Sequence, residues 1–135
     1  MSDKKDILSI DDAALAAEAE ALTARAEPDT GSYTHIFTTP FTHEGETYDQ
    51  LTFRWDNLTG RDSLDIEREL RSRGVTVVIA EYTPEYLTSM AARACTYRDS
   101  DGNRKVSTFT LQAMPIRDFR SICSQARRFL QRAES

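Results

Sequence analysis

From Tyr33 onward, apolar and polar residues alternate with the period of a β-strand that has one covered face. Two runs share this spacing, and their inward positions are Tyr33, His35, Phe37, Thr39 and Phe41, then Leu51, Phe53 and Trp55. Gly45 separates the runs, where a tight turn needs a residue that tolerates positive φ, and His43 belongs to the same turn. Since an isolated hairpin is marginal in water, we expect helices to cover its aromatic face.

A helix is predicted directly after the hairpin. Thr59 can cap it together with Asp62, and Gly74 suits the left-handed residue that ends a helix. The apolar stripe of this helix is narrow and contains Leu64, Ile66 and Leu70. The next segment, Val75 to Ala80, is continuous and β-branched, which favours an extended conformation over a helix. It suits either a third strand or a buried extended connector.

The central core helix is predicted to begin at Thr83 and Pro84, because Thr can cap a helix and Pro fits its first position. Its apolar face is broad and contains Tyr86, Leu87, Met90, Ala91, Ala94 and Tyr97. Asp99 to Asn103 has the composition of a turn. Its opening resembles a calcium loop, but Gly102 comes too early and no Glu closes it.

The chain between Val106 and Met114 is ambiguous, because it is strand-like in composition and flanked by predicted helices. Pro115 then starts a final helix, whose apolar positions are Ile116, Phe119, Ile122, Cys123, Ala126, Phe129 and Leu130. This face suits packing on the protein's own core, and part of it suits a groove on a partner chain.

The first 31 residues differ from the remainder and are predicted to form a helical arm with a linker. They are rich in Ala and Glu, and Leu8, Leu15 and Leu22 repeat every seven residues. Such a seam can lie on the main body or on another chain, including a second copy. The expected organisation is therefore an arm over residues 1–31 and one α+β domain over residues 32–135, in which a hairpin, with or without a third strand, packs against about three helices.

Charge is concentrated in the arm. Residues 1–31 hold eight acids and three bases, a net charge of −5, whereas the remaining chain is balanced. An acidic arm repels polyanions, which argues against nucleic acid as the main ligand. No run of apolar residues is long enough to span a membrane, so we expect a cytoplasmic product that binds neither membrane nor nucleic acid.

Candidate chemistry is sparse in this sequence. The two histidines, His35 and His43, lie in or beside the hairpin, and neither cysteine, Cys95 or Cys123, has a neighbourhood that would activate it. None of these four residues forms a close pair with metal-ligand spacing, and phosphate-loop and dinucleotide motifs are missing. We therefore predict a binding protein without catalytic, cofactor or metal sites.

The order of these features resembles one family. A hairpin with a Gly turn leads into L-T-G-R-D, Leu58 to Asp62, and then an acidic and basic helix. The resemblance continues through Y-L-T-S-M-A-A-R-A, Tyr86 to Ala94, and M-P-I-R-D-F, Met114 to Phe119, and ends at Phe129-Leu130. In these respects the chain is similar to the small tail assembly chaperones of tailed bacteriophages. It departs from them in its acidic arm and in the polar insertion from Asp99 to Lys105.

The resemblance implies a holding chaperone of the bacterial host cytoplasm that binds the long, helical tape measure protein while tail tube subunits assemble around it, either alone or together with the tail tube protein as a second partner. It implies no enzymatic activity and no cofactor. The residues we expect to meet a partner are Phe119, Ile122, Arg127, Phe129 and Leu130 of the final helix, with Leu15 and Leu22 of the arm. Two alternatives are a structural tail component kept in the virion, expected to be richer in strands, and a nucleic-acid-binding regulator that uses the arginines of the final helix.

Overall fold

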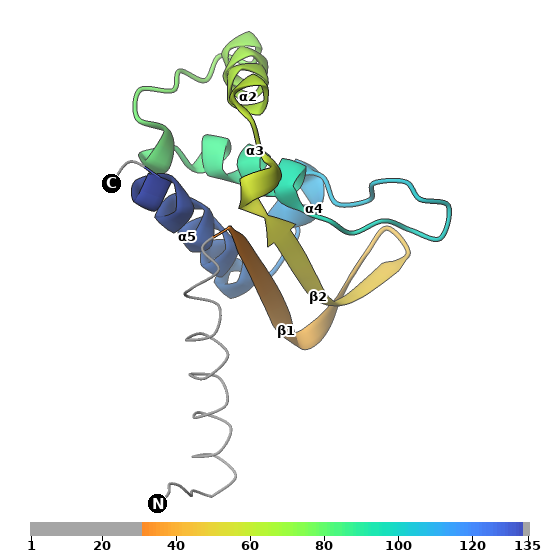
Figure 1. The fold of residues 1–135 in the computed structure, drawn as a ribbon. Helices are drawn as coiled ribbons and strands as arrows, with labels where there is room; N and C mark the ends of the chain where they lie inside the picture. Colours follow the sequence, from red (N-terminus) through yellow and green to blue (C-terminus); the bar gives the residue numbers. More distant parts are fainter. Residues whose placement is uncertain (1–30, 134–135) are drawn as a thin grey trace, which may run out of the picture. The chain divides into compact units, whose positions relative to one another are not determined.

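The computed structural model describes residues 31–133, and they form the predicted α+β domain (Figure 1). In chain order the elements are β1 Ser32–His43, β2 Glu46–Arg54, η1 Trp55–Asn57, α2 Gly60–Ser72, η2 Ala80–Tyr82, α3 Pro84–Ala94, α4 Thr108–Gln112 and α5 Ile116–Ala133. The predicted helical arm lies outside the described residues, except for Gly31.

The two strands pair antiparallel, with His35 opposite Leu51 and His43 opposite Glu46. Glu44 and Gly45 form the two-residue turn with φ of 52° and 84°, so the prediction for Gly45 is confirmed. The register shifts between Ile36 and Phe41, where β1 carries extra residues. This irregularity turns Thr39 outward, and its predicted inward position is wrong.

One face of the hairpin forms the aromatic half of the core. Phe53 is fully buried, and its ring stacks on Trp55 at 5.5 Å and on Tyr33 at 6.4 Å between centroids. Helices α3 and α5 cover this face, and α3 contributes the other half of the core, as predicted. Its buried apolar residues are Tyr86, Leu87, Met90, Ala91 and Ala94. Tyr97 lies beyond the end of α3 and donates a hydrogen bond of 2.6 Å to Glu46.

Helix α2 begins and ends as its sequence predicts. The Thr59 hydroxyl accepts a hydrogen bond from the Asp62 main-chain N–H, and the Asp62 carboxylate accepts one from the Thr59 N–H, which is a capping box. At the other end Gly74 has φ of 84°, and the Val75 N–H donates to the Leu70 carbonyl at 2.8 Å. Ile66 and Leu70 are buried, whereas Leu64, predicted to share their stripe, is exposed.

The segment from Val75 to Ile79 forms neither a third strand nor a fully buried connector. Val75 and Val77 pack against the core, but the alternate residue Val78 faces solvent, and the sheet of the described residues has two strands. The β2 edge is instead extended by the chain after α3, where Cys95 bridges Phe53 and the Thr96 N–H donates to the Thr52 carbonyl at 2.9 Å.

The rest of the chain shows two confirmed predictions and two corrections. Asp99 to Asn103 forms the predicted turn, in which Asp99 accepts hydrogen bonds from two main-chain N–H groups. Pro84 does open α3, but the Thr83 hydroxyl donates to the Ile79 carbonyl and makes no cap. Ile116, predicted to be on the apolar face of α5, is exposed. The ambiguous segment around Thr110 is the short helix α4, capped by Ser107.

Candidate functional site

Three of the exposed large apolar residues of the domain lie within five positions of one another on the connector between α2 and α3. We call Val78, Ile79 and Tyr82 the connector strip, and their exposed fractions are 83%, 51% and 64%. Single exposed apolar residues are normal on protein surfaces, but adjacent ones are typical of interaction sites. In Figure 1 the connector leaves α2 and meets the end of α5 near its C-terminus.

Polar contacts fix the η2 end of the connector strip. The Tyr82 N–H donates to the Ile79 carbonyl at 3.0 Å, which closes the turn of η2. From α5, the Arg127 guanidinium donates from Nε to the Glu81 carbonyl at 2.8 Å and lies 5.8 Å from the centroid of the Tyr82 ring. Because these contacts already position Tyr82, a partner that packs on its ring would lose little free energy in fixing it.

The structure divides the predicted partner-binding residues into three groups. Ile122 is only 1% exposed and belongs to the core. Phe119, Phe129 and Leu130 are half-buried against that core and keep part of their surface outside it. Arg127 anchors the connector.

One of these α5 residues, Leu130, lies on the side of α5 that carries Arg127. Leu130 follows Arg127 by three residues, which places it on the same side of α5, whereas Phe129 lies on the opposite flank. The other two predicted residues, Leu15 and Leu22, lie outside the described residues.

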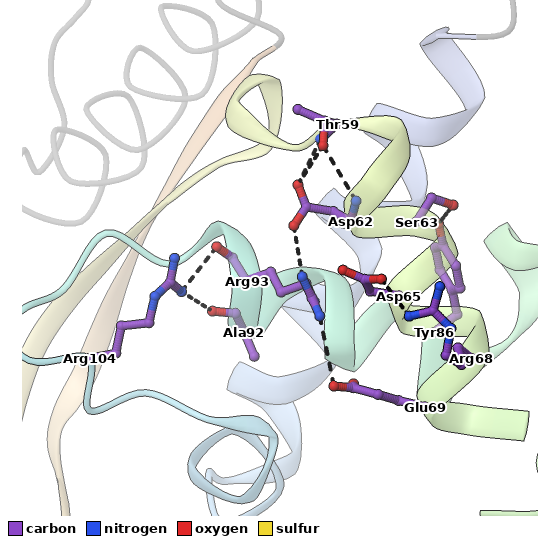
Figure 2. Close-up of polar contacts among 10 residues, drawn as sticks. All are labelled: Thr59, Asp62, Ser63, Asp65, Arg68, Glu69, Tyr86, Ala92, Arg93 and Arg104. Carbon is purple, nitrogen blue, oxygen red and sulfur yellow. Dashed lines mark hydrogen bonds and ion pairs between the residues drawn. The ribbon is translucent and has the colours of Figure 1, made fainter. Parts of the chain in front are cut away.

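A polar network joins α2 to α3 (Figure 2). Arg93 of α3 donates to the Asp62 carboxylate at 2.8 Å and lies 3.8 Å from the Glu69 carboxylate, so one guanidinium spans α2. The Ser63 and Tyr86 hydroxyls are 2.6 Å apart at the same interface. Arg104 reaches the carbonyls of Ala92 and Arg93 at the end of α3. These contacts fix α2, and with it the start of the connector.

The Asp62 carboxylate makes this network sensitive to acid. The Thr59 N–H hydrogen bond, assisted by Arg93, holds the pKa of Asp62 below its usual value of 3.8. A depressed pKa stabilises the fold above the unfolded value, and this stabilisation is lost as the pH falls through the folded value. We therefore expect Asp62→Asn to lower the free energy of unfolding at pH 6 and to approach the wild type at pH 3.

Urea unfolding at both pH values measures this difference. Glu67→Gln is a suitable control, because the Glu67 side chain on the same helix makes no hydrogen bond or ion pair within residues 31–133, and its replacement should change the free energy of unfolding by nearly the same small amount at both pH values. A gap between Asp62→Asn and the wild type that stays constant from pH 6 to pH 3 would contradict the proposed role of the carboxylate.

The buried His35 has a partly buried acidic partner that the sequence did not reveal. Its Nε2–H donates to the Asp118 carboxylate at 2.7 Å, and in the neutral ring Nδ1 accepts from the Tyr33 hydroxyl at 2.9 Å. The order of groups is similar to a hydroxyl–base–acid triad. However, burial, with the nearby Asp118 charge, raises the pKa of Tyr33 to about 12, so its hydroxyl stays protonated at neutral pH. The arrangement joins β1 to α5 and does not supply an active nucleophile.

The cysteines and acidic residues offer no other reactive centre. Burial raises the pKa of both the Cys95 and the Cys123 thiol, which keeps them protonated and weakly nucleophilic, and both are free thiols. Within residues 31–133, no three His, Cys, Asp or Glu side chains gather closely enough to hold a metal ion. A search of the same residues for membrane-spanning helices finds none of sufficient length and hydrophobicity.

Sequence reasoning missed the connector strip although a signal was present. The segment was correctly favoured as extended, and Val75 and Val77 do pack inward. In an extended chain with one covered face, the residues between them must point outward. Val78 has the same parity as Thr76, so the rule places it in solvent, but Ile79 has the parity of Val75 and Val77, and its exposure does not follow from the rule.

Comparisons with protein-family models, with curated proteins and with solved structures give no match to this chain.

Proposed function

We propose that this chain is a tail assembly chaperone of a tailed bacteriophage or prophage. In this function it acts in the host cytoplasm, binds the tape measure protein and shields its apolar helical stripes while tail tube subunits assemble around it. The order of motifs from the hairpin to Phe129-Leu130 supports the family. The observation that carries the binding function is the connector strip, a preformed apolar surface beside the final helix.

The physical task is reversible concealment of apolar surface. Fully burying one Val or Ile side chain contributes about 1.5–3 kcal/mol, and association costs consume much of the gain from a few such contacts. Three strip residues with the exposed part of Leu130 therefore support weak binding. Weak binding suits a chaperone that must release its client when tail tube subunits arrive. No bond is made or broken, which agrees with the protonated state of the Tyr33 hydroxyl and the two thiols.

Co-purification with the tape measure protein encoded nearby tests the proposal. We expect the triple variant Val78→Ser, Ile79→Ser, Tyr82→Ser to retain at most about one tenth of the bound tape measure protein, because it removes the apolar contact and leaves the core intact. The matched control is Ile36→Ser with Leu64→Ser, two residues that are similarly exposed but lie on other surfaces, and it should bind normally.

Equal losses in the strip variant and the control would show that the strip has no special function. Failure of the wild type to bind the tape measure protein would overturn the chaperone proposal itself. Mass spectrometry of purified particles separates the chaperone from a structural tail component, since a chaperone should be missing from the finished tail. The two-stranded sheet of the described residues favours the chaperone, because a tube or connector subunit is expected to be richer in strands.

A further inference from the structure

A recess separate from the connector strip lies over the first half of α3. Its volume is about 310 Å³, and we call it the α3 recess. The residues that matter for its chemistry are Arg73, Glu85, Ser89, Thr108, Gln112 and Phe119, which come from α3, α4, α5 and the chain after α2. This volume is at the small end of the range for ligand pockets, about 300–1,000 Å³, and suits a side chain better than a cofactor.

The residues that line the α3 recess include a buried serine, Ser89. Ser89 is only 5% exposed, and within residues 31–133 its hydroxyl makes no hydrogen bond. Its neighbour Thr88 is equally buried but donates to the Pro84 carbonyl at 2.8 Å. Buried polar groups are nearly always hydrogen-bonded, and an unpaired one calls for an explanation. A bound ligand that pairs with Ser89 supplies one.

The rim of the α3 recess is polar but has no net charge. Arg73 and Glu85 carry opposite charges, and Gln112 presents an amide that both donates and accepts. No ion pair or side-chain hydrogen bond engages these three side chains within the described part of the chain. A carboxylate or phosphate would meet the Glu85 charge, and a cation would meet Arg73. A neutral group that both donates and accepts fits this rim best.

The walls of the α3 recess add an apolar requirement. Phe119 is half-buried and supplies an aromatic surface next to the polar groups. Pro84 adds a second apolar contact in the lining. A ligand with an aliphatic stem and a neutral polar end uses all of these features.

We propose that the α3 recess binds the side-chain amide of a Gln or Asn residue presented by a partner polypeptide. Its carbonyl oxygen accepts from the Ser89 hydroxyl and Arg73, its NH₂ donates to Glu85, and its stem packs on Phe119. This inference is independent of the tail assembly function, since it rests on the recess alone.

Three blocked tripeptides test the proposal: acetyl-Leu-Gln-Leu-amide and its Glu and Met counterparts, which share one backbone and nearly one shape. Titration into the full chain, followed by amide chemical shifts, should give millimolar binding of the Gln peptide, with shifts at Arg73, Ser89 and Gln112. The Glu and Met peptides should bind at least fivefold more weakly. Equal binding of the Glu peptide or of the Met peptide, or no shift with the Gln peptide, would each overturn the proposal.

The variant Ser89→Ala tests the hydroxyl directly. It should weaken binding of the Gln peptide at least threefold. It should not lower Tm, because the unpaired hydroxyl is replaced by a residue of higher helix propensity. Ser124→Ala, an exposed serine of α5 that does not line the recess, should leave binding unchanged. A lower Tm for Ser89→Ala, or unchanged peptide binding, would contradict the inference.

Discussion

Replacing Phe53 by alanine is expected to lower the free energy of unfolding by about 3–5 kcal/mol. Phe53 is fully buried, its ring lies between Tyr33 and Trp55, and its main chain bridges Cys95. The substitution removes the contact between the hairpin and the covering helices and leaves a cavity between two stacked rings. Since domains are typically stable by only about 5–15 kcal/mol, part of the variant should be unfolded without denaturant.

Urea unfolding followed by tryptophan fluorescence measures this loss. Trp55 is the single tryptophan, it is buried, and it stacks on the altered position, so its emission reports on the core. Ile36→Ala is the control, because Ile36 is on the same hairpin but exposed, and its effect should stay within about 0.5 kcal/mol. A loss below about 1 kcal/mol for Phe53→Ala would show that the hairpin does not organise the core.

The second large effect is expected at Asp118. Replacing it by alanine leaves the buried His35 Nε2–H without its acceptor at 2.7 Å, and an unpaired buried donor costs about 1–3 kcal/mol. Asp118→Asn keeps an oxygen that can accept the same hydrogen bond, so its free energy of unfolding should fall by less than that of Asp118→Ala. Both variants remove the carboxylate from the first turn of α5 and so lose its interaction with the helix dipole equally. The difference between their free energies of unfolding therefore reports the hydrogen bond alone.

Urea unfolding at pH 7 of His35→Ala, Asp118→Ala and the double variant completes the experiment. The sum of the two single-variant losses in free energy of unfolding should exceed the loss in the double variant. The difference, which is the coupling energy, should be about 0.5–3 kcal/mol. If Asp118→Ala and Asp118→Asn were equally stable, or if the coupling were zero, the contact would not join β1 to α5.

The parts of the fold that were predictable from the sequence depend on local chemistry. The turn at Gly45, the capping box of Thr59 and Asp62, the left-handed Gly74 and the opening of α3 at Pro84 each require particular residues at fixed spacing. Such signals do not depend on what packs nearby, so they were confirmed.

The predictions that failed concern which side of an element meets the core. Leu64 and Ile116 have the right spacing for their helices, but neither faces a neighbouring element, and no periodicity states where neighbours lie. Thr39 turned outward because the irregularity in β1 changes the alternation beyond Ile36. His35 and Asp118 are 83 residues apart, and only the packing of α5 on β1 brings them together.

The candidate site was partly predictable. The sequence predicts an apolar face on the final helix, and the structure confirms it. Most of that face packs on the protein's own core, which was one of the two alternatives that the sequence left open. The connector strip was missed because a β-branched run was expected to be buried. The α3 recess could not be predicted, because it requires residues from separate elements to surround one hydroxyl.

The irregularity in β1 also affects how the protein behaves at high concentration. A regular edge strand exposes a row of N–H and C=O groups that can recruit further chains into an aggregate. In β1, Pro40 lies within the irregular stretch and has no N–H to offer, so a ladder growing along that edge would be interrupted there. The outer edge of β1 is therefore a poor template for strand-by-strand association between copies of this chain.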